Sequence, residues 1–423
     1  MKPRRPLLAL TMGALLLLPV GTAAAAPAAP PVDHSRVVGD RPVQWTPHVL
    51  DGAVKDILRV GDTVVVAGDF DRISEAMGGR VLEQPNLFAF EHGTGRVLRS
   101  FSPQVDGTVT SLAPGPDATV IVGGDFGSVD GRASPGLARL SVSDGRAVPG
   151  FRGFLDDGDA YRVAVHGGHL YVGGDFSGVN GTPRAALARL DTRTGAVDTG
   201  FAPHLTEFRR GKLKVQELAL SPDGRRLAVN GTFTKVNGLD RYQIAMIDTA
   251  SGTPTPWSTA AYEADCGGSS LHTYMRQMAF SPDGSFLAVV AAGGRQVKPG
   301  LCKSVSRFEN TDTPNAEPTW TNKTGGDSLY SVEVTSAAVY VSGHQRWMDN
   351  PLGALNPGPG SVEREGIAAV DPVTGRALAW NPGRERGHGA EALHATPDGL
   401  YVGSDTERLA GDYHARLGMF PLS

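Results

Sequence analysis

Short apolar runs recur along the chain, and each run ends at glycine or at a polar turn. Three copies are closely similar: residues 64–70, 120–126 and 170–176 all lead from a mainly β-branched run into Gly-Asp-Phe. Runs of this length with glycine at the exit are typical of strands rather than helices. No long stretch shows apolar residues at the three- and four-residue spacing of an amphipathic helix. The pattern therefore predicts an all-β protein.

Turn signals divide each repeat into strands. A Pro-Asp-Gly turn precedes three of the four weaker copies of the apolar run, as at 222–224. Such a turn predicts a tight hairpin, because proline presets φ, aspartate bonds to its own backbone and glycine accepts a positive φ. A further apolar run leads into an Asp-rich turn, as at 187–195, and a last segment ends at an aromatic residue. Each unit is therefore predicted to contain four antiparallel strands, named A to D in chain order.

The terminal aromatic residue of the unit recurs every 50 to 63 residues, at Phe101, Phe151, Phe201, Trp257, Trp320 and Trp380. The last unit lacks it, and the matching sequence lies near the N-terminus as Trp45-Thr46-Pro47. A repeat that begins at one end of the chain and finishes at the other is expected of a closed ring. The sequence thus predicts a seven-bladed β-propeller of four-stranded antiparallel blades, closed by an N-terminal strand that completes the last blade. The aromatic residues are expected to pack between blades.

The N-terminus has the pattern of a secretory signal peptide. Lys2, Arg4 and Arg5 precede an apolar run at 7–20, and small residues follow at 23–25. This run is too short for a membrane span with its flanks. Removal of the signal changes the formal net charge from −4 to −7, which disfavours nucleic acid as a partner. The expected organisation is a signal peptide at 1–25, a flexible segment at 26–41 and a single propeller domain at 42–423, with no membrane span after signal removal.

The chain has two cysteines, Cys266 and Cys302, which lie 36 residues apart in the fifth unit. Export permits a disulfide, and both cysteines fall on loops that are predicted to leave the same face. On the chain-entropy view such a bond would stabilise the fold by about 3–4 kcal/mol. Two unrelated thiols remain the alternative. Histidines at zinc spacing are absent from the sequence, so neither a metal nor a cofactor is expected.

The repeated Gly-Gly-Asp-Phe motif at 123–126 and 173–176, in a chain with a signal peptide, resembles the delta-60-repeat β-propellers of secreted bacterial proteins. The Ser-Pro-Asp-Gly-Ser-Phe-Leu-Ala stretch at 281–288 is similar to WD40-like and TolB-like blades. The unit length, about 57 residues, is near that of kelch repeats. The resemblance covers nearly the whole mature chain and implies a secreted or envelope-associated bacterial propeller. It implies no catalytic residue.

The alternation of strand direction sorts the loops onto two faces. In an up-and-down blade the A–B and C–D hairpins leave one face, and the B–C loops and D–A connections leave the other. The long insertions all belong to the second face, and loops gathered on one side of a rigid scaffold commonly carry function. We therefore expect a ligand on this face. The candidate binding residues are Arg209, Arg210, His272, His344, Arg346, Trp347, Arg384, Arg386 and His388.

These candidates have simpler explanations as well. Arginine pairs suit a carboxylate or phosphate ligand but are also common on solvated surfaces. Trp347 would contact a partner or sugar, or pack onto its own blade. The acids Asp69, Asp125 and Asp175 begin three B–C loops, where aspartate most simply accepts backbone N–H groups and holds the loop.

The metalloprotease, nucleophile-elbow and phosphate-loop motifs are absent from the sequence. The sequence therefore favours a monomeric, non-catalytic binding scaffold for an extracellular protein or glycan. The alternative is an extracellular hydrolase or lyase with its active site at the channel mouth of the same face. A structural component of the wall or spore coat is a third interpretation. The acids and bases available to the alternative are Glu263, Asp265, His272, His344 and His388.

Overall fold

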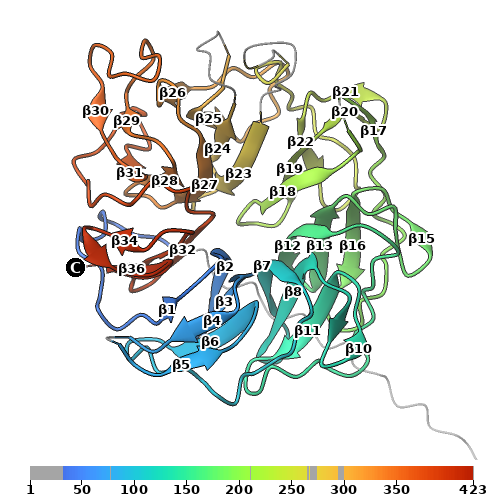
Figure 1. Cartoon of the computed structure of the whole chain (residues 1–423). Helices are drawn as coiled ribbons and strands as arrows, with labels where there is room; N and C mark the ends of the chain where they lie inside the picture. Colours follow the sequence, from blue (N-terminus) through green and yellow to red (C-terminus); the bar gives the residue numbers. More distant parts are fainter. Residues whose placement is uncertain are drawn as a thin grey trace, which may run out of the picture.

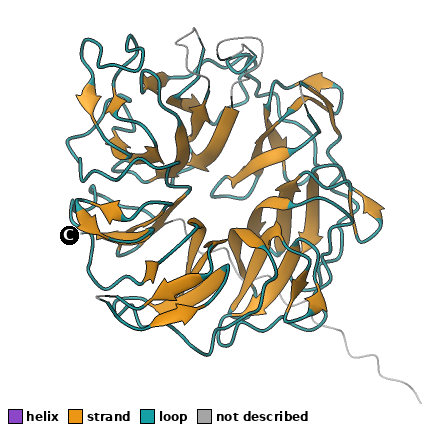
Figure 2. Ribbon diagram, viewed as in Figure 1, coloured by secondary structure: helices purple, strands orange, loops and turns teal. Residues whose placement is uncertain are grey.

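The computed structural model describes residues 32–76, 78–209, 211–263, 266, 274–293 and 300–422. These residues form strands, turns and loops, and no helix is found among them (Figure 2). The prediction of an all-β protein is confirmed. Within the same part of the chain no helix could cross a membrane. The predicted signal peptide lies outside the described residues.

Seven antiparallel sheets of three or four strands contain most of the strand residues of the described chain, and we number them in chain order. Sheets 1 to 3 are formed by β2 (Ala53–Val60), β3 (Thr63–Asp69) and β6 (Leu87–Glu91); β7 (Thr108–Gly115), β8 (Thr119–Asp125) and β11 (Leu137–Ser141); and β12 (Ala160–His166), β13 (His169–Gly174) and β16 (Leu187–Asp191). Sheets 4 and 5 are formed by β18 (Val215–Leu220), β19 (Arg226–Gly231) and β22 (Ile244–Asp248); and β23 (Tyr274–Phe280), β24 (Phe286–Ala292), β25 (Ser304–Glu309) and β26 (Trp320–Lys323). Sheets 6 and 7 are formed by β27 (Leu329–Val334), β28 (Val339–Gly343) and β31 (Ile367–Val370); and β32 (Ala392–Thr396), β33 (Gly399–Gly403) and β36 (Leu417–Pro421).

The central strand of each sheet is apolar on both faces because each sheet packs against two others. In β3, Val65 and Ala67 belong to a cluster shared with sheet 2. Val64 and Val66, which point to the opposite side, belong to a cluster shared with Tyr401 and its neighbours in sheet 7. The period-two alternation of a strand therefore serves two interfaces at once.

The expected fourth strand is present only in sheet 5, as far as the described residues extend. In five other sheets it is reduced to one isolated bridge, such as Phe90 with Val97 and Leu190 with Val197. After this bridge the chain turns and buries its aromatic residue, so that Phe101 and Phe201 are almost fully covered. This inward turn takes the backbone away from the sheet edge. The aromatic residues therefore pack into the interior, as the repeat predicted, but without a regular outer strand.

The sheets are arranged around a common centre, with β2, β7, β12, β18, β23, β27 and β32 nearest to it (Figure 1). These inner strands correspond to strand A. Side chains on them accept backbone N–H groups from the next sheet. The pairs are Asp56 with Leu112 (2.8 Å), Ser111 with Val163 (3.0 Å), Gln277 with Val332 (3.1 Å), Glu333 with Ala395 (3.3 Å) and His394 with Arg59 (3.2 Å). The last pair joins sheet 7 to sheet 1.

The N-terminal segment runs along the outer edge of sheet 7. The backbone N–H groups of Gly39 and Val43 donate to the carbonyl oxygens of Pro421 and Met419 in β36, both at 2.9 Å. No strand is assigned to residues 39–43. Trp45 packs against aromatic rings of sheets 1 and 7. The described part of the segment predicted to be flexible, 32–41, thus makes specific contacts.

Most B–C loops contain a short hairpin where irregular loops were expected. These accessory strands are β4 (Arg72–Ser74), β5 (Val81–Glu83), β9 (Ser128–Val129), β10 (Arg132–Ala133), β14 (Gly178–Val179), β15 (Thr182–Pro183), β20 (Phe233–Val236), β21 (Leu239–Asp240), β29 (Trp347–Met348), β30 (Val362–Glu363), β34 (Arg408–Leu409) and β35 (Asp412–Tyr413). Several turn through two residues of positive φ, as at Asp130-Gly131 and Asn180-Gly181. Asn-Gly and Asp-Gly are the residues that such primed turns prefer, so the sequence held a signal for these hairpins.

The D–A connections pair with the B–C hairpins. Two of them form strands, β1 (His48–Val49) beside β4 and β17 (Leu205–Phe208) beside β20. Others make single bridges, such as Val105 with Val129 and Leu155 with Val179. This pairing places the two kinds of connection side by side, as the alternation of strand direction predicts.

Candidate functional site

Two of the predicted arginines meet at one buried carboxylate, Asp327, in the connection between β26 and β27. Arg346 donates to it from Nε at 2.9 Å and from Nη2 at 3.3 Å, and Arg386 donates from Nη2 at 3.3 Å. The Arg346 guanidinium also lies 4.4 Å from the centre of the Trp347 ring. These contacts fix Arg346 and Trp347 on the protein itself. Sequence reasoning missed Asp327, because it follows Gly325-Gly326 and resembles an ordinary turn residue.

The histidines His344 and His388 are neighbours, but they meet through a backbone carbonyl. The Nδ1–H of His344 donates to the His388 carbonyl oxygen at 3.3 Å, and its Nε2 accepts the Ser328 N–H at 3.2 Å. Burial lowers the pKa of His344, which matches this neutral arrangement. Arg386 donates from Nε to the His344 carbonyl oxygen at 2.7 Å. Three predicted residues are therefore brought together, with the His344 ring engaged internally.

Arg384 was predicted on the binding face, and the structure places it in the interior. Its side chain is 1% exposed. It donates from Nη1 to Thr406 Oγ1 at 2.9 Å and from Nη2 to the Gly343 carbonyl oxygen at 2.5 Å. Burial lowers its pKa to about 10. A side chain so enclosed links sheets 6 and 7 and reaches no ligand on the surface.

Of the remaining predicted residues, the structure describes Arg209. Arg209 lies after β17 and donates to the Glu263 carbonyl oxygen. Arg210, His272 and Asp265 lie outside the described residues. In the part of the chain that is described, no group of three or more His, Cys, Asp or Glu side chains could hold a metal.

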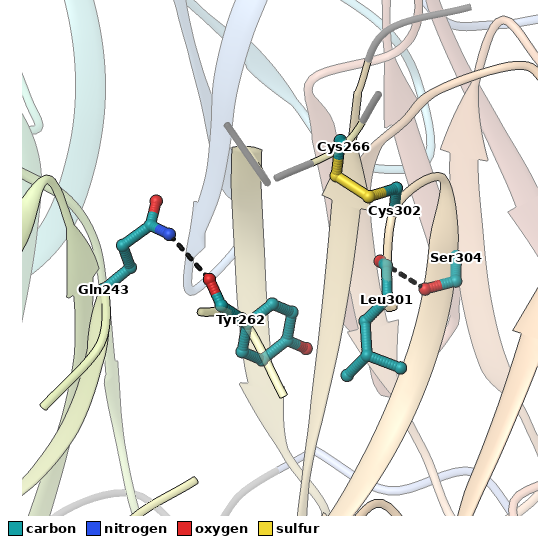
Figure 3. The surroundings of a disulfide bond; sticks show 6 residues. All are labelled: Gln243, Tyr262, Cys266, Leu301, Cys302 and Ser304. Atoms are coloured by element: carbon teal, nitrogen blue, oxygen red, sulfur yellow. Dashed lines mark hydrogen bonds between the residues drawn. A yellow bond between two sulfur atoms is a disulfide. The ribbon is translucent and has the colours of Figure 1, made fainter. Parts of the chain in front are cut away.

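The predicted disulfide between Cys266 and Cys302 is confirmed, with a Cα–Cα distance of 5.6 Å (Figure 3). It joins the D–A connection that enters sheet 5 to the segment that leads into β25. Beside it, Gln243 Nε2 donates to the Tyr262 carbonyl oxygen at 2.8 Å. The disulfide thus secures a unit that lacks the Gly-Asp-Phe motif of sheets 1 to 3.

A cavity of about 310 Å³ lies at the centre of the sheets and receives side chains from the inner strand or its approach in all seven. Of the predicted binding residues that the structure describes, His388 alone lines it. Six further lining residues, which we call the mouth residues, occupy equivalent places in sheets 1 to 6. They are Lys55, Thr110, Tyr161, Gln216, Arg276 and Tyr330.

A β-bulge in each of these inner strands directs the mouth residue into the cavity. The pairing of β2 with β3 skips from Val54 to Asp56, so that Lys55 is the extra residue. The same shift leaves out the mouth residue in β7, β12, β18 and β27. In β23 the pairing skips from Met275 to Met278 and leaves out both Arg276 and Gln277. A bulge bends its strand and re-aims one side chain. The cavity wall is thus built by the same device repeated from sheet to sheet.

Sequence reasoning missed the mouth residues although a signal was present. Each bulge appears as two non-aliphatic residues inserted between apolar ones, as in Val54-Lys55-Asp56-Ile57 and Val109-Thr110-Ser111-Leu112. In a regular strand, where apolar and polar residues alternate, only one non-aliphatic residue would separate the two apolar ones. The insertion recurs at 160–163, 215–218, 275–278 and 329–332. A periodic irregularity of this kind could have been found by aligning the units with one another.

Ion pairs link the sheets around the cavity. Arg162 contacts Asp56 Oδ2 at 3.1 Å and Glu217 Oε1 at 2.7 Å, so it joins sheet 3 to sheets 1 and 4. Although burial lowers the pKa of Arg162, the carboxylates of Glu217 and Asp56 raise it overall. Lys55 pairs with Glu391 at 2.9 Å and joins sheet 1 to sheet 7. Each acid that lines the cavity therefore has a cationic partner.

Asp175, the acid of the Gly-Asp-Phe motif in sheet 3, orients one mouth residue. It accepts the Tyr161 hydroxyl and the Lys212 ammonium, both at 2.5 Å, and the Asp159 N–H at 2.9 Å. Burial raises the pKa of Asp175, but the bonds from Lys212 and Tyr161 lower it overall. The B–C loops of sheets 1 to 3 are held by other acids. Asp51, Asp106 and Asp157, which precede strand A, accept the loop N–H groups.

The structure thus defines a β-propeller domain with an axial polar cavity. A family model described as a β-propeller domain of unknown function (DUF5122) matches residues 168–201. These residues include β13 and β16 and end at the buried Phe201. A search of curated proteins found no match to the chain. The family match agrees in class with the resemblance seen in the repeats.

Proposed function

We propose that the chain is a closed, seven-bladed β-propeller that works outside the cell as a non-catalytic binding scaffold. Closure is supported by the bond from the Arg59 N–H to His394, which joins the first and last sheets. It is further supported by the N-terminal segment beside β36. Residues 39–43 would then take the place of the outer strand of the last blade.

The observation that carries the binding function is the axial cavity beside the D–A connections. His388 and Glu391, which precede β32, line the same cavity as the six mouth residues. The wall combines amide, hydroxyl, aromatic and charged groups. Such a mixture is suited to orienting a polar ligand in a concave site. The ligand class we propose is an extracellular glycan, or a protein that presents one.

The electrostatics of the cavity favour binding over proton transfer. Glu217 and Glu391 line it, and each forms an ion pair with Arg162 or Lys55. A general acid or base needs a carboxyl group with a pKa near the working pH and free access to the reacting proton. Burial raises the pKa of Glu217, and the ion pair with Arg162 opposes that rise. Both carboxylates are held by cations and so lack free access to a reacting proton, while their oxygen atoms can still accept hydrogen bonds from a ligand.

The sequence supports export as part of this proposal. The positive residues Lys2, Arg4 and Arg5 and the apolar run at 7–20 are the pattern of a cleaved signal. The mature protein would be a monomer that is secreted or held at a bacterial cell envelope.

The test is a thermal-shift screen of the mature protein, residues 26–423, against soluble glycans and cell-wall fragments. A ligand present at 100 times its Kd should add about 2.7 kcal/mol of stability. Binding should survive Arg225→Ala in the A–B turn of sheet 4 on the opposite face. It should be lost when Thr110→Trp fills the cavity. Absence of a shift with every glycan, or loss of binding in the Arg225 variant alone, would contradict the proposal.

A further inference from the structure

Two cations converge on one oxygen of the buried carboxylate of Asp327. Arg346 and Arg386 each place Nη2 at 3.3 Å from Oδ1 of this residue. Among the described residues, Asp327 is the one acid within ion-pair distance of either arginine. Arginine keeps its proton in proteins, so two guanidinium groups against a single carboxylate leave an excess of positive charge. A bound anion would neutralise that excess.

Lys303, the residue before β25, adds a third cation to this cluster. Its ammonium nitrogen is buried and makes no hydrogen bond to another described residue. Thr324 links it to Asp327, because the Thr324 N–H donates to the Lys303 carbonyl oxygen at 3.1 Å and Thr324 Oγ1 accepts the Asp327 N–H at 3.2 Å. Burial lowers the pKa of Lys303, and the negative charge of Asp327 opposes that decrease. A buried ammonium without a hydrogen bond is unfavourable, and an anion bound nearby would offset that cost.

Both arginines keep hydrogen-bond donors for a ligand. Arg346 uses Nε and Nη2 on Asp327, whereas Arg386 uses Nη2 on Asp327 and Nε on the His344 carbonyl oxygen. Within the described chain the Nη1 group of neither residue makes a hydrogen bond, and the two side chains are 32% and 36% exposed. Each Nη1 group carries two N–H donors. Arginine side chains with free donors of this kind suit the oxygens of a phosphate or carboxylate group.

Contacts within the protein fix both guanidinium groups before any ligand binds. The Arg346 guanidinium lies 4.4 Å from the centre of the Trp347 ring. Arg386 is held from the other direction by the His344 carbonyl oxygen, at 2.7 Å from its Nε. Donors that are already held in place lose little conformational entropy when they bind a ligand. The cluster therefore combines excess positive charge with preorganised donors.

His344 connects this cluster to the wall of the axial cavity. Its carbonyl oxygen accepts Arg386, and its ring lies 5.5 Å from the ring of Tyr330, one of the mouth residues. The same ring donates from Nδ1 to the carbonyl oxygen of His388, which also lines the cavity. The cluster is thus next to the cavity without being part of its lining.

We propose that Arg346 and Arg386 bind a phosphate group, with Lys303 adding to the positive potential. A phosphate monoester carries nearly two negative charges at neutral pH. Three cations around one carboxylate leave two positive charges, which a carboxylate ligand would balance only by half. The phosphate belongs to a free ion or to a phosphorylated sugar, since both present the same oxygens. This second site goes beyond the proposed glycan function and does not depend on it.

The experiment is isothermal titration calorimetry on the mature protein with inorganic phosphate, D-glucose 6-phosphate and acetate as separate probes. Both phosphates should bind roughly tenfold more tightly than acetate, because they carry more charge and more acceptor oxygens. Arg386→Gln should weaken phosphate binding by about tenfold, and Arg386→Lys should weaken it less, because lysine keeps the charge but loses the fork of donors. The matched control is Arg225→Gln, at an exposed arginine in the A–B turn of sheet 4, which should leave phosphate binding unchanged.

Lys303→Met keeps the test valid if the Arg386 variants fold poorly. This change removes a buried charge that has no hydrogen bond, so the melting temperature should not fall. Phosphate affinity should nevertheless decrease by about threefold, because one cation is lost from the cluster. Acetate binding as tight as phosphate binding would overturn the proposal. Unchanged phosphate affinity in both Arg386→Gln and Lys303→Met would overturn it as well.

The two phosphate probes distinguish the two sources. Tighter binding of D-glucose 6-phosphate than of inorganic phosphate supports a phosphorylated sugar, and equal binding supports the free ion. Thr110→Trp, which fills the axial cavity, should leave the affinity for inorganic phosphate unchanged. If phosphate binds while no glycan does, this site stands and the glycan function fails. If glycans bind while neither phosphate does, the phosphate site fails and the glycan function stands.

Discussion

Adjacent positions on the inner strands of this protein serve different purposes. The mouth residues line the cavity, and the residues after them, Asp56, Ser111, Arg162, Glu217 and Gln277, bond to neighbouring sheets. The division is incomplete, because Arg162, Glu217 and Gln277 also line the cavity. Among the mouth residues, Lys55 and Thr110 also bond to neighbouring sheets. Both sets are polar and both vary from sheet to sheet. In sheets 1 to 4 the bulge distinguishes the two sets, because it leaves the mouth residue out of the strand pairing and keeps the next residue in it. Polarity along a strand therefore does not by itself distinguish a binding residue from a structural one.

We expect the largest loss of stability among these positions when Arg162 is replaced. Arg162→Met removes the cation from two carboxylates and leaves Glu217, whose side chain is 6% exposed, without its partner. Breaking a buried ion pair in this way costs about 3–5 kcal/mol. The matched control is Lys55→Met, which breaks the more exposed pair with Glu391 and should cost less than about 1 kcal/mol. Urea unfolding of both variants tests the contrast, and equal losses would contradict it.

Glu333 of β27 accepts the Ala395 N–H of sheet 7 at 3.3 Å and makes the contacts between sheets sensitive to pH. Burial raises the pKa of Glu333 to about 8, so the folded protein holds a proton that the unfolded chain has lost. Between the unfolded value near 4.5 and the folded value near 8, the stability that this group contributes decreases as pH rises. Glu333→Gln should remove this contribution to the pH dependence of the unfolding free energy. The expected change is on the order of 2–4 kcal/mol between pH 5 and pH 8. Urea unfolding at the two pH values measures it, and parallel slopes for both proteins would exclude this role.

Ser111 tests a single neutral contact between sheets. Its hydroxyl is fully buried and accepts the Val163 N–H at 3.0 Å. Ser111→Ala leaves that N–H without an acceptor, and we expect a loss of about 1–2 kcal/mol. Thr110 is not a suitable control, because its hydroxyl donates to the Ala160 carbonyl oxygen of sheet 3 at 2.7 Å. The comparison in thermal unfolding is therefore Gln216→Ala, and a larger loss for Gln216 than for Ser111 would contradict the assignment.

Gln216 should show the smallest effect on stability. Gln216→Ala changes a side chain that lines the cavity, and substitutions away from packed contacts stay within about 0.5 kcal/mol. Its neighbour Glu217 is bonded to Arg162 and should not tolerate the same change. Differential scanning calorimetry of Gln216→Ala and Glu217→Ala would compare the melting temperatures of variants at two adjacent residues. A substantial loss of stability in the Gln216 variant would show that this mouth residue also stabilises the fold.

The sequence predicted the regular parts of this fold well, since they depend on local patterns. The apolar runs that end in Gly-Asp-Phe became central strands, and the disulfide between Cys266 and Cys302 followed from their shared face. The outer strands were overestimated, because burial of Phe101 and its equivalents takes the chain off the sheet edge. That outcome depends on packing between units, which no single unit reveals.

The candidate site was less predictable, because the sequence does not show which acidic residue each charged side chain of a loop will contact. Arg346 and Arg386 meet at Asp327, and Arg384 lies inside the protein. Pairings of this kind depend on folded geometry rather than on neighbours in sequence. The mouth residues were hidden for another reason: a bulge adds one residue to a strand, and a short polar pair such as Lys55-Asp56 resembles ordinary strand alternation unless several units are compared.

The bond between Arg59 and His394 has a consequence for the order of folding, since it joins residues 335 positions apart. Closing so long a loop adds little to the free-energy cost, about 0.6 kcal/mol for each doubling of length. Contacts distant in sequence nevertheless slow the search for the native state. We expect the meeting of sheets 1 and 7 to be a late kinetic step. Until it occurs, the apolar side of β3 that carries Val64 and Val66 stays uncovered and is open to association with other chains.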